Sequence, residues 1–388
     1  MVSRTADGLK SLLNTLQAGC RKLRLEISEK KSKVVAPGED EWRVSDLDGT
    51  PVVTLKQVLF YKYLGVRTFG TMFKTAAEKQ KVALGTAAKY KGATLKISKT
   101  GPDVVEVTGA CWLQVAVPSI LFGCETVPFT ESNIVTLERI QSSVAKYALG
   151  LPRYSPNVVA QTEMGWRSVR HQLYRQQLSF YVRLNSLPTS RWAYQALMEH
   201  QTGGWHSSYL AYILRLRSEV GMLDFMPSKR VVQLHLDGHF LRVTNDVVSR
   251  LSQPALRPQR SWPGAGYVCE SDEASTIAKI KVACAGLGNK APRTGMPRRS
   301  YCPLCGPGVE INERHVIASC KGVLDVRRGS GVSGMLALFR AEGLEEEDSF
   351  YKYVNGLDSK RVKVTREAYL SRGSAMGEVV EAWLSRTK

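Results

Sequence analysis

The chain has 388 residues, of which 43% are hydrophobic and 23% are charged. This composition allows a sizeable buried core, so it excludes a wholly disordered chain, and the length predicts two or three domains. The 54 basic residues outnumber the 35 acidic ones, which gives a formal net charge of +19 and a pI near 9.6. Such an excess predicts a polyanionic partner: nucleic acid is favoured, and an anionic membrane surface is the alternative.

The amino-terminal sequence MVSRTADGLK lacks the apolar run of a secretory signal peptide. We therefore expect an intracellular protein, in the nucleus or the cytoplasm. The most apolar stretch, residues 110–124, is too short to cross a bilayer and contains Gln114 and Pro118. We expect it to be a buried helix and expect no membrane partner. Eight cysteines in an intracellular protein predict reduced thiols or a metal site rather than disulfides.

Residues 5–25 carry leucines at helical spacing, which predicts an amphipathic helix. The next stretch, LEISEKKSKVV, predicts a strand entered through a charged turn at residues 29–33. Residues 42–55 predict a hairpin that turns at Asp48 and Gly49. We assign Asp48 to this turn and not to a calcium loop, because Gln57 stands where the loop would need its last acidic ligand.

Residues 55–99 concentrate the positive charge. Ten cations against one acid, Glu78, give this segment +9 of the formal +19. Six aromatic residues lie among the cations, and this combination suits phosphates and exposed bases. The alternative is a solvated basic helix that follows a strand. The cations are Lys56, Lys62, Arg67, Lys74, Lys79, Lys81, Lys89, Lys91, Lys96 and Lys99.

After the YLGV sequence at residues 63–66 the periodicity changes from strand-like to helical. Three helices are expected, over residues 73–90, 104–122 and 130–149. The third has an apolar face and ends at Gly150, which is followed by Pro152. The residues of that face are Ile134, Leu137, Gln141, Val144 and Ala148.

Helical periodicity continues to about residue 251. Residues 253–266 and 286–300 are rich in Pro, Gly and Arg, so they predict linkers or arms that become ordered on binding. A last helix is expected over residues 365–384, with an apolar stripe that packs on its own domain. The stripe comprises Tyr369, Leu370, Met376, Val379, Val380 and Trp383.

Cys302, Cys305, His315 and Cys320 form a C-x2-C-x9-H-x4-C pattern. Two cysteines two residues apart make a knuckle, and a His and a Cys one helical turn apart complete a tetrahedron. Three thiolates and one imidazole suit zinc and leave no open position, so the pattern predicts a structural zinc site on which local folding depends. The alternative is a set of unrelated buried cysteines.

Residues 329–334, GSGVSG, match the dinucleotide pattern G-x-G-x-x-G. No βαβ unit surrounds them, so we expect a turn before a helix. The chain contains neither a G-x-S-x-G elbow nor a phosphate-binding P-loop sequence. Hydrolase and NTPase functions therefore have no support.

Several short motifs follow one another along the chain: a leucine helix ending in Cys20, KSK at residues 31–33, YLGV at residues 63–66 and PSILFGCET at residues 118–126. Their order resembles the palm helix, lysine turn, primer grip and thumb of the reverse transcriptases of non-LTR (LINE-type) retrotransposons. The cysteine pattern at residues 302–320 is similar to the cysteine-rich segment that follows the polymerase in that family.

The resemblance implies an α+β fold that is predominantly α-helical, with a small β palm remnant, a helical thumb bundle and a small zinc knuckle. The implied domains are the palm end with its primer grip (1–70), the thumb (71–155), a helical connector (156–285), a basic arm with the knuckle (286–325) and a helical tail (326–388).

The resemblance also implies binding of RNA, DNA or an RNA/DNA hybrid by the C-terminal part of such an enzyme. The family's catalytic carboxylates precede the first helix and have no counterpart in this sequence, so no catalytic residue is assigned and we expect no polymerisation by this chain alone. Mg²⁺ is expected only if a missing N-terminal region completes an active RNA-directed DNA polymerase, which is one alternative. A zinc-stabilised helical scaffold for protein partners is the other.

The expected nucleic-acid contacts combine the basic residues with the primer-grip motif. By resemblance, Lys31 lies near the phosphates of an incoming nucleotide, and residues 63–65 lie near the primer end. The expected contacts are Lys31, Lys33, Lys62, Tyr63, Leu64, Gly65, Lys74, Lys79, Lys81, Lys89, Lys91, Arg298 and Arg299.

Overall fold

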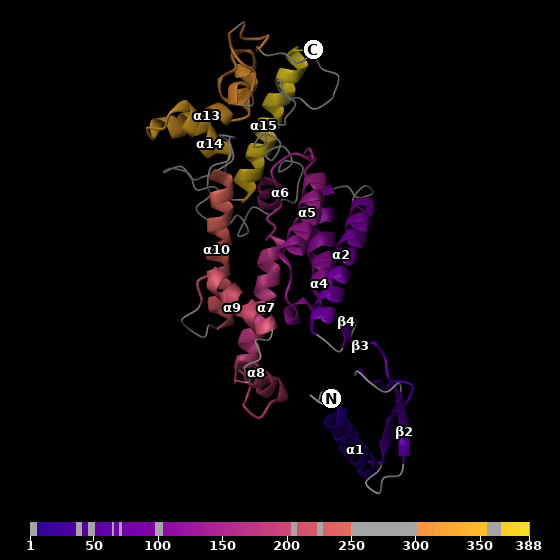
Figure 1. Cartoon of the computed structure of the whole chain (residues 1–388). Coiled ribbons are helices and arrows are strands. Elements are labelled where there is room, and N and C mark those ends of the chain that lie inside the picture. Colours follow the sequence, from indigo (N-terminus) through magenta and orange to yellow (C-terminus); the bar gives the residue numbers. More distant parts are fainter. Residues whose placement is uncertain are drawn as a thin grey trace. The chain divides into compact units, whose positions relative to one another are not determined.

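A computed structural model gives the fold of the chain (Figure 1). The fold is α+β and predominantly helical, as the sequence predicted. The chain divides into two compact units, one formed by residues 1–83 and 126–129 and the other by residues 84–125 and 130–388. The structure describes residues 6–35, 41–45, 51–63, 66–69, 72–97, 104–202, 208–222, 228–249, 301–306, 308–312, 314–354 and 366–387.

The first unit begins with α1 (Ala6–Lys22), which packs on the antiparallel hairpin of β1 (Glu41–Ser45) and β2 (Pro51–Lys56). Leu13 of the helix meets Trp42, Val44 and Leu55 of the hairpin in one buried cluster. This confirms the predicted helix and hairpin. The expected turn at Asp48 and Gly49 lies outside the described residues.

The strand predicted from LEISEKKSKVV is not formed, although its charged turn is present at residues 29–31. Only Val34 pairs with the sheet: its N–H donates to the carbonyl of Lys56 at 3.1 Å, and its carbonyl accepts from Val58 at 2.8 Å. The prediction was wrong because the alternating charged residues of this stretch form an exposed turn and not a ladder.

A second hairpin pairs β3 (Phe60–Tyr63) with β4 (Val66–Phe69), closed by the pair Tyr63 and Val66. The YLGV motif therefore spans the tip of a hairpin, of which Leu64 and Gly65 lie outside the described residues. Shortly after this hairpin begins α2 (Met72–Ile97), a helix of 26 residues that extends beyond the predicted end at residue 90.

The second unit contains a continuous helical stretch made of α3 (Val104–Ala110), the π-helical segment η1 (Cys111–Ala116) and α4 (Val117–Leu121). Among the described residues, this stretch is the one helix whose length and composition would allow it to cross a membrane. Core helices of globular proteins meet the same criterion, and Trp112, Ala116 and Ile120 are buried here.

The helix α5 (Glu131–Ala148) buries all five residues of its predicted face, and Gly150 ends it in the left-handed conformation with φ of 60°. The helices that follow confirm the predicted helical pattern, and α7 packs against α5, α8, α9 and α10. They are α6 (Asn157–Glu163), α7 (Val169–Asn185), α8 (Trp192–Thr202), α9 (Ser208–Glu219) and α10 (Lys229–Ser249).

The fully buried Gln141 joins three segments of this unit. Its Oε1 accepts a hydrogen bond from the indole N–H of Trp112 at 3.2 Å, and its Nε2 donates to the carbonyl of Arg167 at 2.9 Å. The Trp112 ring also stacks on Trp166, with centroids 6.2 Å apart. The amide of Gln141 therefore links α5 to the buried Trp112 and to the backbone that precedes α7.

Replacing Gln141 by Ala is expected to reduce the free energy of unfolding by about 3 kcal/mol. The change leaves the buried indole N–H of Trp112 without its partner, removes one of the two side-chain hydrogen bonds to the carbonyl of Arg167, and opens a cavity. Urea unfolding measures the difference. The matched control is Gln195→Ala on the exposed side of α8, for which we expect a change within about 0.5 kcal/mol. A Gln141 variant as stable as that control would contradict the prediction.

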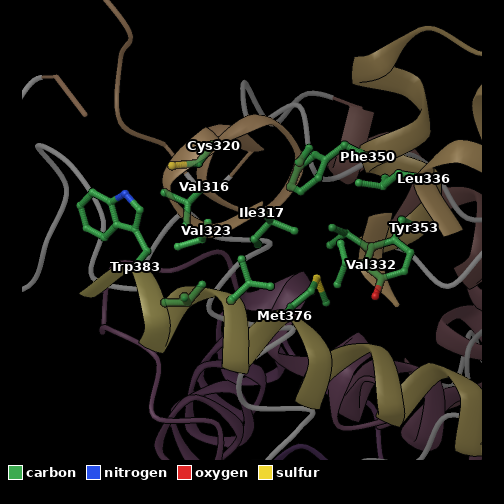
Figure 2. Packing of buried hydrophobic residues seen from close by; sticks show 14 of the residues in the cluster. Val316, Ile317, Cys320, Val323, Val332, Leu336, Phe350, Tyr353, Met376 and Trp383 are labelled. Carbon is green, nitrogen blue, oxygen red and sulfur yellow. The ribbon is translucent and has the colours of Figure 1, made fainter. Parts of the chain in front are cut away.

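The C-terminal module, defined as residues 301–387, has one hydrophobic core that the knuckle and its following helices share (Figure 2). This core crosses the domain boundary expected between residues 325 and 326. The helices are η5 (His315–Ser319, a π-helical turn), η6 (Lys321–Val323), α12 (Leu324–Gly329), α13 (Val332–Ala341), α14 (Glu346–Val354) and α15 (Arg366–Thr387).

Two expectations about this module are confirmed. Gly331 of the GSGVSG motif adopts φ of 77° directly before α13, so the motif forms a turn before a helix. The last helix is present as α15, and four residues of its predicted stripe, Met376, Val379, Val380 and Trp383, are buried in the core. The side chains of Tyr369 and Leu370 lie outside the described residues.

Candidate metal centre

The first half of the cysteine cluster is a tight turn held by backbone hydrogen bonds. The N–H of Cys302 donates to the carbonyl of Val309 at 2.8 Å, and the carbonyl of Cys302 accepts from Gly306 at 3.0 Å. Gly306 and Gly308 have φ of 96° and 107°, a conformation that favours glycine. The sequence Cys-Pro-Leu-Cys-Gly therefore folds back on itself and brings Cys302 and Cys305 together.

The second half is the single π-helical turn η5. Asn312 lies shortly before it, and its side-chain Oδ1 accepts a hydrogen bond from the N–H of His315, the first residue of the turn, at 2.8 Å. The turn closes where the N–H of Cys320 donates to the carbonyl of His315 at 2.7 Å. His315 and Cys320 thus stand at the two ends of one short turn.

These halves bring one ligand atom from each of the four predicted residues within 4.8 Å of the others. The Cys320 sulfur lies 3.8 Å from that of Cys302 and 3.6 Å from that of Cys305. Two sulfurs that each lie ~2.3 Å from a tetrahedral ion would be ~3.8 Å apart. The four side chains therefore have the spacing needed to hold a metal ion, which confirms the predicted cluster as a candidate metal site.

The environment of the thiols differs from one cysteine to the next. Burial raises the pKa of Cys320 to about 12. Burial also raises the pKa of Cys305, but the backbone N–H of Lys321, 3.4 Å away, and the Cys320 thiol outweigh it, so this pKa lies below its usual value. A metal ion that binds here displaces protons from thiols, because the thiolate is the ligand.

Two residues of α15 support the cluster and were not predicted to do so. The indole N–H of Trp383 donates to the sulfur of Cys302 at 3.4 Å. Arg386 donates to the carbonyl of Gly322 and forms a bidentate ion pair with Asp325, at 2.8 and 2.7 Å. The contact of Trp383 with Cys302 is of the kind that orients a metal ligand, whereas Arg386 fixes the segment directly after Cys320. The sequence showed Trp383 only as part of an apolar stripe.

No family model matches the chain, and no curated protein or solved structure matches it either. The resemblance to non-LTR reverse transcriptases therefore depends on the order of the short motifs.

Gly322 lies directly behind the knuckle, and its replacement tests the packing there. A Cβ atom at this position would lie 2.5 Å from the Cβ of Leu304, which sits between the two knuckle cysteines. Gly322→Ala is therefore expected to displace the knuckle and destabilise the C-terminal module by about 1–3 kcal/mol. The thermal midpoint of the metal-loaded protein measures this loss.

The control for this prediction is Gly329→Ala in α12, where an added Cβ would have no atom within 4 Å. Alanine is a better helix former than glycine, so the control should be neutral or slightly stabilising. Equal midpoints for the two variants would show that the contact with Leu304 does not matter.

The expected nucleic-acid contacts fall into separate places. Lys31 is exposed in the charged turn, and Lys33 is partly buried, with its Nζ 3.4 Å from the carbonyl of Glu29. The backbone of Lys62 and Tyr63 lies in β3. The contacts outside the described residues are Leu64, Gly65, Arg298 and Arg299.

One of the lysines expected on the surface of α2 is buried. Lys79 is only 6% exposed and lies on the same side of the helix as the buried residues Ala76 and Ala83. The prediction that Lys79 contacts nucleic acid is therefore wrong, because a buried lysine does not reach a phosphate group at the surface. Lys91 is partly exposed.

The remaining lysines of α2 form a row, which we call the lysine row. At 100° per residue its members fall within an arc of about 80° on one face, opposite the buried residues Ala83 and Ala87. Gly85 and Gly92 lie on the same face, and each has open space where a side chain would begin. The row comprises Lys74, Lys81, Lys89 and Lys96, all exposed. Lys96 was not among the expected contacts.

Proposed function

We propose that this protein binds nucleic acid along the lysine row of α2, and that a structural zinc ion holds its C-terminal module folded. The lysine row is the observation that supports nucleic-acid binding. Its four lysines are spaced seven, eight and seven residues apart, which corresponds to about 10–12 Å between neighbours along the helix. A row of this kind can follow a sugar–phosphate backbone and displace its counterions.

Surfaces that favour solubility typically intersperse both signs of charge. Among its 26 residues, α2 has six lysines and one acid, Glu78. The two glycines of the exposed face add to this argument, because a face without side chains between the lysines lets a phosphate backbone approach closely. The row therefore favours a polyanion as partner over a solvated surface.

Zinc is the metal that the donor set favours. Three sulfurs and one imidazole nitrogen form a closed tetrahedral set, and the two sulfur–sulfur distances of 3.6 and 3.8 Å suit it. Such a set leaves no position for water or substrate, so the role we propose for the ion is structural. Cys302, Cys305, His315 and Cys320 would hold it.

The ligand we propose is RNA or an RNA/DNA duplex, in keeping with the resemblance to the part of a non-LTR reverse transcriptase that follows its catalytic residues. The YLGV motif supports this choice by its position, because the β3–β4 hairpin whose tip it spans leads within a few residues into α2. In the family that the chain resembles, this motif belongs to the primer grip.

The test is the salt dependence of binding by the full chain to three probes of equal length: duplex RNA, an RNA/DNA hybrid and duplex DNA. Four phosphate contacts predict that log K falls with log salt concentration at a slope of about −3.6. Stronger binding to the RNA-containing probes supports the proposed ligand. A slope near zero, or no binding at low salt, would refute nucleic-acid binding and leave a protein scaffold as the better function.

A further inference from the structure

A cavity of about 390 Å³ lies in the second unit, where the end of α4 meets α7 and the start of α10. Hydrogen bonds of residues next to its lining join α7 to the neighbouring segments. Gln177 of α7 donates through Nε2 to the carbonyl of Cys124 at 3.1 Å, and its Oε1 accepts from the hydroxyl of Tyr212 at 3.0 Å. The cavity therefore lies beside a hydrogen-bonded junction of helices, and the turn after α4 contributes Phe122 and Gly123 to its lining.

Two aromatic rings line this cavity. Phe122 ends α4 and remains 52% exposed, although it is large and apolar. Phe180 comes from α7, and the guanidinium group of Arg183 lies over its ring, 5.1 Å from the centroid. Flat apolar rings and a guanidinium plane are the surfaces on which nucleic-acid bases stack.

The polar groups of the cavity also fit a nucleotide. Arg183 and Lys229 provide two cations against one acid, Glu125. The Oε1 of Gln176 is buried and has no hydrogen-bond partner within the described part of the chain. A buried acceptor without a donor destabilises a fold, and the amino group of a base is a donor that would satisfy it once the amide turns toward the cavity.

We infer that this cavity takes one nucleotide of a single-stranded nucleic-acid segment. The base stacks on Phe122, and the adjoining phosphate pairs with Lys229 or Arg183. This inference rests on the proposed function and extends it, because the lysine row contacts phosphates alone and does not distinguish paired from unpaired bases. A cavity that accepts a single base requires an unpaired strand.

The experiment compares a single-stranded oligonucleotide of 12 residues with a blunt duplex of the same length, both fluorescently labelled, on the full chain. Phe122→Leu removes the aromatic ring but keeps an apolar side chain. We expect it to weaken single-strand binding about 5- to 100-fold and to leave duplex binding unchanged. Phe122→Tyr should bind the single strand like the wild type, which shows that the ring, and not altered folding, is responsible.

Two controls match these changes. Trp192→Leu removes another exposed aromatic residue, 83% exposed and outside the cavity. Arg230→Gln removes the exposed cation next to Lys229, whereas Lys229→Gln removes the one that lines the cavity. Single-strand affinities of Phe122→Leu and Lys229→Gln equal to those of their controls would overturn the inference while the proposed function stands. A wild type that binds neither probe would overturn both.

Discussion

Replacing Cys320 by Ser is expected to abolish stoichiometric zinc binding and to unfold the C-terminal module. Cys320 is the candidate ligand whose sulfur lies within 3.8 Å of both other thiols. It also ends the turn that carries Val316 and Ile317 into the shared core, where they face α15 (Figure 2). Binding of a structural zinc ion contributes about 10–16 kcal/mol in zinc-finger peptides, which is as much as the whole stability of a typical domain.

Zinc content per chain and hydrogen exchange along α15 measure the two consequences separately. Cys111→Ser is the matched control, since Cys111 is a partly buried thiol outside the cluster. It should retain one zinc ion per chain and slow exchange in α15. Treatment of the wild type with a chelator should reproduce the Cys320 variant, and added zinc should reverse the treatment. One zinc ion per chain in Cys320→Ser would contradict a four-ligand site.

The sequence could predict those features that depend on neighbours in the chain. The buried face of α5 follows from the helical period, because large apolar residues occupy one side of it. The candidate metal ligands were predictable for the same reason, since all four lie within residues 302–320 and a knuckle is a local turn. The hairpin of β1 and β2 was likewise indicated by its turn and its alternation.

Other features depend on packing between distant segments and left no local signal. Trp383 reaches the sulfur of Cys302 across 81 residues of sequence. Lys79 could not be recognised as buried, because six of the thirteen apolar residues of α2 are alanines, and the apolar residues occur on several sides of the helix and do not define its inner face. The exposed charged stretch before Val34 resembled a strand because charges in a turn can alternate like those in a sheet.

Replacing all four residues of the lysine row by Gln is expected to remove most of the salt dependence of nucleic-acid binding. Each phosphate contact contributes about −0.9 to the slope of log K against log salt, so the slope should become less negative by about 3.6. Between 50 and 200 mM salt the wild type should therefore lose about 100-fold more affinity than the variant. Glutamine is an uncharged residue with a helix propensity similar to that of lysine, and the exposed positions have little influence on stability.

The control for this variant removes the same amount of charge elsewhere. Its four substitutions to Gln are at exposed cations outside α2: Lys22, Arg139, Arg153 and Arg230. Both variants reduce the formal net charge from +19 to +15, because each loses four cations, so non-specific attraction to a polyanion weakens equally in both. A local contact with the lysine row predicts a large change of slope in the first variant and a small one in the control. Equal slopes would show that net charge alone governs binding and that α2 is not the interface.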